Sequence, residues 1–363
     1  MTYGRWHRRC CGTGWSPTSR PKPPTGPARI WCASWSEEGP GWAEDDHAAA
    51  ITAFRNTCRA ARDPGVAGVC RSARALGPLG PEAARGFFEA NFRAEAVGAD
   101  GVLTAYFAPE YPARAAPDAE FSAPLRAKPS DLSGVDAGVF DPAQAGKPAS
   151  AMIVDGQVLP YPDRAGIEAM RPEKVLAWMR PEELFFLQIQ GSGVLTFADG
   201  RRMKAVYAAN NGRPFVGIAN PMRERGLLAP DATSGEAIRT WLADHRGPEA
   251  EAIMQLNPRY VFFTLAPDDG RQPVGSAGVP LPPGRAIAVD PSRHAMGELF
   301  WLDAEAPILA GAFPAYRRLV TALDTGGAIK GEVRADLYLG LGARAGAEAG
   351  RVRHALRLYR LVP

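Results

Sequence analysis

The sequence predicts a mainly β protein with a small β-barrel in its C-terminal third. Glycine and proline number 39 and 34 among 363 residues, which favours turns and short strands over long helices. From residue 260 onward, short apolar runs alternate with Gly/Pro turns, a pattern typical of a small barrel. A further region, residues 184–208, combines apolar runs with Gly-Ser-Gly and Asp-Gly turns.

The chain composition indicates a globular protein with room for two domains. Hydrophobic residues make up 46% and charged residues 22%. The net charge of +3 is too small for a dedicated nucleic-acid-binding protein. No run of 18 apolar residues is present, so the sequence predicts no membrane-spanning helix.

The five cysteines, Cys10, Cys11, Cys32, Cys58 and Cys70, all lie in the first 70 residues, which excludes a metal-ligand set. Cys58 and Cys70 either bridge across a short loop or remain free thiols, and the spacing allows both.

Residues 1–40 are rich in Pro, Ser, Arg and Trp without periodicity, which predicts disorder. No apolar core of a secretion signal is visible there, and Cys10 and Cys11 lack the small apolar residues that precede a lipid-attachment cysteine. A mis-assigned start codon would explain this.

The elements before residue 184 mix helices with extended segments. Residues 41–61 and Gly80–Val97 have the apolar periodicity of helices. Gly101–Arg114 is expected to be a strand that enters a Pro-broken loop, and residues 115–150 extended loops. Asp163 is expected to cap a helix.

The strongest β pattern follows. Leu184–Ile189, Val194–Phe197 and Met203–Ala208 are predicted as strands, and residues 221–256 as helices. The C-terminal barrel is expected to use the runs YVFFTL, RAIAVD, LFWLDA, RLVTALD, RADLYLGLG and LRLYRLV.

Three aspartates, Asp290, Asp324 and Asp336, each stand where a predicted strand meets a loop. Carboxylates on one rim of a barrel can converge, and their pKa values can then separate. The structural alternative is that each aspartate caps a turn.

The sequence lacks the complete motifs of several other enzyme classes. Asp324-Thr325-Gly326 matches one aspartic-protease loop, but such enzymes need two. No nucleophile elbow, zinc-binding or phosphate-binding motif occurs. His294 and His354 are isolated and expected to be structural or exposed. Aromatic residues beside Gly, Asn and Gln suit sugar rings, although each one alone fits a core position better.

Several segments resemble characteristic sequence segments of one bacterial protein family, and they occur in the same order as in that family. They are LTAYFAPEY, LPYPDRAGIE, FLQIQGSG, YAANNGRPF, NPRYVFF, GVPLPPGRAIAVDP and DTGGAIKGEVRADLYLGLGARAGAEAGRV. Over residues 41–363 the chain resembles the membrane-bound lytic murein transglycosylase A family. The last block is similar to the family's C-terminal three-aspartate domain.

This resemblance implies a double-psi β-barrel domain with a second, smaller β-barrel domain inserted and a substrate groove between them. The expected boundaries are 41–105 plus 255–363 for the first domain and 106–254 for the insert, with residues 1–40 outside both.

The resemblance also implies a peptidoglycan lytic exotransglycosylase, although the residues themselves leave exo or endo action open. Such an enzyme cleaves the β-1,4 bond between N-acetylmuramic acid and N-acetylglucosamine, and the muramoyl C6 hydroxyl attacks C1 to leave a 1,6-anhydro end. Asp336 matches the catalytic acid/base, and Asp324 the partner that orients or tunes it. The implied substrate-binding residues are Thr104, Tyr106, Gln190, Gly191, Ser192 and Asp290, of which Asp290 is the more structural. Lys330 contacts substrate or caps its loop.

No cofactor or metal is implied. The expected partner is the peptidoglycan glycan strand, with cell-wall synthesis or division complexes as further candidates and no nucleic acid. The protein is expected to be a periplasmic monomer associated with the outer membrane. Two alternatives stay open: a non-catalytic peptidoglycan-binding module, and a hydrolytic muramidase. The hydrolase would need a second carboxylate, for which Glu110 is the nearest candidate in sequence.

Overall fold

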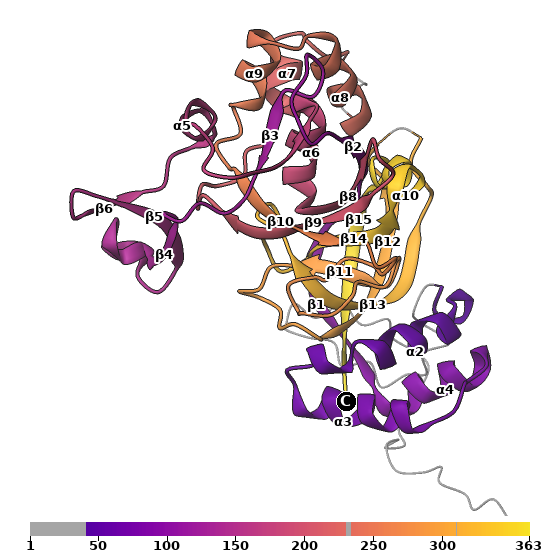
Figure 1. Ribbon diagram of the computed structural model, residues 1–363. Coiled ribbons are helices and arrows are strands. Elements are labelled where there is room, and N and C mark those ends of the chain that lie inside the picture. Colours follow the sequence, from indigo (N-terminus) through magenta and orange to yellow (C-terminus); the bar gives the residue numbers. More distant parts are fainter. Residues whose placement is uncertain (1–40, 230–233, 310) are drawn as a thin grey trace, which may run out of the picture.

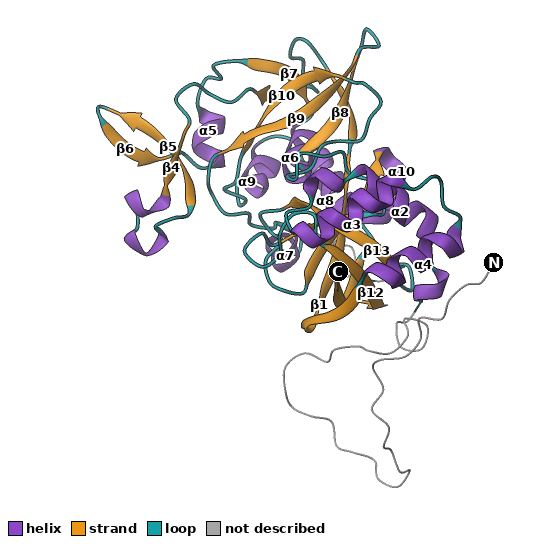
Figure 2. Ribbon diagram, turned by 90° about the horizontal axis from the view of Figure 1, so that it is seen from below, coloured by secondary structure: helices purple, strands orange, loops and turns teal. Residues whose placement is uncertain are grey.

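The computed structural model describes residues 41–229, 234–309 and 311–363 and is mainly β (Figures 1 and 2). The predicted disordered N-terminus, with Cys10, Cys11 and Cys32, lies outside the described residues. Within the described part of the chain, no helix is both long and apolar enough to cross a bilayer.

A closed six-stranded barrel forms from the two ends of the described chain, in the order β1-β14-β11-β13-β12-β15. The pairs β1/β14 and β11/β13 are parallel, and the other neighbours are antiparallel. Alternate side chains fill an apolar interior that includes Leu103, Phe300 and Leu337. The strands are β1 Arg93–Ala108, β11 Ala286–Val289, β12 Leu299–Pro307, β13 Tyr316–Thr325, β14 Arg334–Leu341 and β15 Arg353–Val362.

The expected C-terminal barrel is therefore confirmed, with one strand corrected. The run YVFFTL contributes to β10 Val261–Pro267, which pairs with β9 Arg202–Asn210 of the insert instead of entering the barrel. Its local sequence resembles that of the barrel strands, and only long-range pairing distinguishes them.

The insert forms a smaller ring around its own core. Its sheet has the order β10-β9-β8-β2, and β3 pairs with β7. Isolated bridges Arg114↔Trp178 and Ala127↔Phe263 join the two pieces, which agrees with the expected second barrel. The strands are β2 Glu110–Ala113, β3 Ala123–Arg126, β7 Val175–Met179, β8 Ser192–Phe197 and β9 Arg202–Asn210.

A three-stranded arm projects from the insert in Figure 1. It contains β4 Ser133–Asp136, β5 Pro148–Val154 and β6 Gln157–Pro160. The prediction of loops alone for residues 115–150 is therefore wrong. Short extended runs without clear alternation gave no strand signal, because their neighbours decide whether they pair.

The prediction of a strand at Leu184–Ile189 is also wrong, because these residues belong to helix α6 Pro181–Gln190. Pro181 stands in the first turn, two glutamates follow it, and Gly191 ends the helix with a left-handed φ of 80°. These are strong helix-boundary signals that outweigh the β-branched and aromatic content of the run.

The other helices cover the two barrels. α2 His47–Asn56, α3 Pro64–Ala75 and α4 Pro81–Asn91 pack on the main barrel. The helix predicted to reach Val97 ends at Asn91, shortly before β1 begins at Arg93, and α3 was not predicted. Asp163 caps α5 as expected, by accepting from the Gly166 amide at 2.9 Å. The remaining helices are α5 Arg164–Ala169, α7 Ala219–Glu224, α8 Gly235–Asp244, α9 Pro248–Met254 and α10 Gly342–Ala349.

Candidate functional site

Strand β14 separates apolar from functional side chains by simple alternation. Ala335 and Leu337 belong to the barrel core, so Asp336 and Tyr338 lie on the opposite, outer face. Sheet order places β14 between β1 and β11, and β11 lies next to β13.

This order aligns four residues in one row across the sheet. Thr104 pairs with Asp336, Asp336 with Ala288, and Ala288 with Asp324. Strands lie about 4.8 Å apart, so the two aspartate backbones are separated by roughly 10 Å across Ala288. Ala288, whose side chain is a single methyl group, stands between the two aspartates in this row.

The Asp336 carboxyl is partly buried and has one direct donor. The Thr104 hydroxyl donates to its Oδ1, and its Oδ2 has no hydrogen-bond partner among the described residues. Burial raises the pKa of Asp336, the Thr104 hydrogen bond and the charge of Arg334 oppose that rise, and Asp324 adds to it. Asp336 can therefore keep its proton at a higher pH than an ordinary aspartate.

The Asp324 carboxyl is held by four donors. The Tyr106 hydroxyl donates to Oδ2 at 2.8 Å. The amide and hydroxyl of Ser276 donate to Oδ1 at 2.9 and 2.8 Å, and the Thr325 amide donates to the same oxygen at 2.9 Å. Burial and the nearby Asp324 raise the pKa of Tyr106 well above its ordinary value, so this donor stays protonated.

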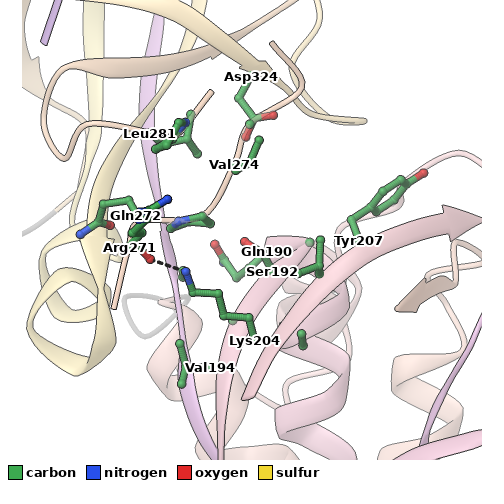
Figure 3. Close-up of a pocket in the computed structure, with 18 of the residues that line it drawn as sticks. Gln190, Ser192, Val194, Lys204, Tyr207, Arg271, Gln272, Val274, Leu281 and Asp324 are labelled. Atoms are coloured by element: carbon green, nitrogen blue, oxygen red, sulfur yellow. Dashed lines mark hydrogen bonds between the residues drawn. The ribbon is translucent and has the colours of Figure 1, made fainter. Parts of the chain in front are cut away.

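A cavity of about 690 Å³ lies beside Asp324, between the insert and the main barrel. Its insert wall includes Gln190, Gly191 and Ser192, which were predicted to line a groove, while Asp324 stands on the barrel side. Figure 3 shows Gln190, Ser192 and Asp324 around the space, with half-exposed Tyr207 on the same strand as Lys204. The Lys204 ammonium donates to the Arg271 carbonyl at 2.6 Å.

Asp336 lines a smaller, adjoining cavity of about 120 Å³. Arg259 and Gly327 stand in the walls of both cavities. The loop from Thr325 to Gly327 therefore divides the chamber that holds Asp336 from the larger one that holds Asp324.

Asp290 lines neither of the two cavities. Its Oδ2 accepts from the Gly331 amide at 2.9 Å, and its Oδ1 accepts from the Ser292 hydroxyl at 2.8 Å. Lys330 is exposed, with its ammonium 3.9 Å from Asp290 Oδ1. Asp290 thus braces the segment that joins the other two aspartates.

Sequence reasoning missed Ser276, Arg259 and Lys204. Ser276 lies in a Gly-rich turn 48 residues before the carboxylate it contacts, so no local signal marks it. Burial lowers the pKa of Arg259, and only the fold shows that its side chain reaches both cavities.

The histidines and Glu110 have other roles. His294 and His354 are buried and contact backbone carbonyls. Glu110 is exposed and pairs with Arg202 at 2.7 Å, outside the residues that line the two cavities. No group of three metal-ligating side chains occurs within the described ranges.

Two family models match the chain: the MltA specific insert domain over residues 102–264 and the 3D domain over residues 285–362. The membrane-bound lytic murein transglycosylase A of Vibrio cholerae is 32% identical over 267 residues, which are 72% of this chain and 65% of that protein. The Escherichia coli K12 protein of the same name is 31% identical, over 71% of this chain and 64% of its own length. The chain thus spans just under two thirds of these curated relatives.

Solved structures extend the likeness over nearly the whole chain. The crystal structure of a membrane-bound lytic murein transglycosylase from Agrobacterium tumefaciens matches with a TM-score of 0.80 and 32% identity, covering 93% of this chain and 97% of that one. Escherichia coli MltA with bound chitohexaose matches with a TM-score of 0.65 and 27% identity, over 89% and 90%. By its two matched domains, its barrel and this identity, the chain belongs to the membrane-bound lytic murein transglycosylase A family.

Proposed function

We propose that the protein is a lytic transglycosylase that cleaves the β-1,4 bond between N-acetylmuramic acid and N-acetylglucosamine in peptidoglycan. The observation that carries the proposal is the Asp336 carboxyl, partly buried, with a raised pKa and an unpartnered oxygen among the described residues. A carboxyl of this kind suits a general acid, which must keep its proton at a higher pH than an ordinary aspartate does.

The glycan strand is proposed to lie in the larger cavity and to reach Asp336 past the Thr325–Gly327 loop. The cavity offers a half-exposed aromatic ring, Tyr207, and amide and hydroxyl groups from Gln190 and Ser192. Aromatic faces and polar edges together suit sugar rings. A relative whose structure holds chitohexaose supports a saccharide ligand for this fold.

The chemistry needs one carboxyl that acts twice. Protonated Asp336 donates its proton to the glycosidic oxygen while the bond from that oxygen to C1 of the muramoyl residue breaks. The resulting carboxylate then accepts the proton of the muramoyl C6 hydroxyl as its oxygen bonds to C1. No water is consumed, and the product is a 1,6-anhydro end.

Asp324 is proposed to stabilise positive charge that develops at the sugar ring and to keep Asp336 protonated. Its oxygens already accept four hydrogen bonds, so it is poorly placed to activate a water. This argues against the hydrolytic alternative, which needs a second basic carboxylate.

The test is a digest of purified peptidoglycan by the wild-type chain, Asp336→Asn and the exposed control Asp244→Asn, with products identified by mass spectrometry. Anhydro-muramoyl products from wild type and control, lost in Asp336→Asn, are expected. Products heavier by one water would establish a hydrolase, and binding without products a wall-binding module.

We further propose a periplasmic, outer-membrane-associated location for a monomeric enzyme, supported by the membrane-bound designation of its relatives. We place the insert at residues 106–267, because β10 pairs with β9. Membrane fractionation and light scattering test location and oligomeric state, and co-purification tests association with wall-synthesis or division complexes.

A further inference from the structure

A third cavity, of about 210 Å³, lies inside the insert near the end of β3, helix α5 and strand β10. It shares no lining residue with the two cavities of the proposed active site. Its floor contains the buried residues Arg126, Tyr161, Ile167 and Phe262, and its rim contains exposed polar and charged residues.

The Arg126 guanidinium forms the charged part of this floor. The residue is only 7% exposed, yet no carboxylate of the described chain forms an ion pair with it. Its Nη2 donates to the Glu168 carbonyl at 3.3 Å, whereas its buried Nε has no partner. A buried cation that lacks a directly paired carboxylate is unfavourable, so the site can accept an anion from outside.

The rim adds a second cation without an ion pair and two carboxylates, each of which accepts hydrogen bonds on one oxygen. Arg171 is exposed and has neither a hydrogen bond nor an ion pair within the described ranges. Asp131 accepts from the Tyr161 hydroxyl at 2.9 Å. Glu173 accepts from the Ser130 amide and hydroxyl at 2.8 and 3.1 Å. The unused side-chain donors of the cavity therefore belong to the two arginines.

The size and the walls of the cavity restrict the ligand further. At 210 Å³ it is smaller than the ~300–1,000 Å³ of sites that enclose whole drug-sized ligands. Ile167, Met170 and Phe262 supply an apolar wall suited to a short aliphatic side chain. The carboxylates at the rim leave acceptor capacity for an amino or amide N–H group.

We propose that this cavity binds the carboxylate of a small amino acid or of the C-terminal end of a short peptide. A planar guanidinium presents paired donors that match the two oxygens of a carboxylate. This site is separate from the proposed glycan cavity, and the inference does not depend on transglycosylase activity.

Binding is measured by NMR with isotopically labelled full-length protein and three probes: N-acetyl-alanine, alanine and the uncharged N-acetyl-alaninamide. We expect N-acetyl-alanine and alanine to cause saturable chemical-shift changes at the backbone amides of Ala127, Ser130 and Glu173. N-acetyl-alaninamide should cause none. Tighter binding of N-acetyl-alanine indicates a peptide end as the source, and tighter binding of alanine indicates a free amino acid.

Variants test the contribution of each arginine to binding and distinguish it from an effect on folding. Arg171→Gln, on the exposed rim, is expected to weaken N-acetyl-alanine binding by roughly tenfold, as expected for one charged hydrogen-bonding pair. Arg126→Gln should abolish binding, and Glu173→Gln should strengthen it by removing a negative charge. The control Arg62→Gln, exposed and distant in the N-terminal helical region, should leave it unchanged.

The proposal is overturned if N-acetyl-alaninamide binds as tightly as the acid, or if neither carboxylate gives a saturable shift. It is also overturned if Arg171→Gln binds N-acetyl-alanine like wild type. If inorganic phosphate binds with the same affinity as N-acetyl-alanine, the cavity is a general anion site and the proposed ligand class is wrong.

Discussion

The Tyr106 hydroxyl donates to Asp324 Oδ2 at 2.8 Å, and two positions earlier on the same strand the Thr104 hydroxyl donates to Asp336. One strand thus supports both aspartates, because residues i and i+2 of a strand share a face. Each aspartate can therefore be tested separately by replacing the residue whose hydroxyl donates to it.

Tyr106→Phe should weaken activity while leaving the fold intact. Asp324 loses one of four donors, which costs about 1–2 kcal/mol and corresponds to roughly a tenfold lower kcat/KM if the interaction acts in the transition state. The measurement is peptidoglycan solubilisation, with Tyr316→Phe as control, since Tyr316 also contacts a carboxylate, Glu348, at 3.1 Å. Equal losses in both variants would point to a general effect of removing a buried hydroxyl.

Activity should depend on the protonated form of Asp336. Because burial raises the pKa of this residue, the rate is expected to fall as pH rises through that raised pKa. Thr104→Val removes the hydrogen bond that lowers the pKa, so the alkaline limb of the kcat/KM profile should move to higher pH. Thr104→Ser keeps a hydroxyl at this position, so its alkaline limb should lie at the same pH as that of wild type. An unmoved limb in Thr104→Val would show that another group controls it.

Asp336→Asn should stabilise the protein at neutral pH. A folded-state pKa above the unfolded value means that the folded state loses stability as pH rises from the unfolded pKa through the raised one. Removing the charge should raise Tm by a few degrees at pH 7 and by little below the unfolded pKa. A lower Tm at pH 7 would mean that the ionised carboxylate is well satisfied.

His294 should contribute stability that disappears as pH rises. Burial lowers its pKa, but contacts with Glu298 and the Glu332 carbonyl outweigh that effect and raise the pKa overall. The contribution is therefore complete below the unfolded pKa and is lost as pH rises through the raised folded one. Glu298→Gln should flatten this part of the stability curve, measured by urea unfolding. Identical curves for both proteins would contradict the assignment.

The Cys58–Cys70 disulfide, one of the two possibilities left open by the sequence, is formed in the structure. Replacing both cysteines, as Cys58→Ser/Cys70→Ala, should lower the free energy of unfolding by about 2–3 kcal/mol for a loop of this size. A reducing agent should lower the Tm of wild type and leave that of the variant unchanged. A wild-type Tm insensitive to reduction would show that the bridge does not stabilise the fold.

The sequence by itself determined the local features of this protein. Alternation in RADLYLG put Asp336 on one face of a strand and the apolar residues on the other, and turn residues marked the β8–β9 hairpin. The motif order indicated the family and its two-barrel plan. These properties depend on neighbouring residues, whose φ/ψ preferences and polarity can be read directly.

Tertiary structure decided which residues meet. Asp324 and Asp336 lie in one row only because β11 inserts Ala288 between their strands, and Ser276 and Arg259 reach the site from other segments. Residues Leu184–Ile189 have a strand-like composition but form part of helix α6, and β10 pairs with a strand of the insert rather than of the main barrel. Strand pairing and burial are set by long-range packing, and no local pattern encodes the partner that a strand will find.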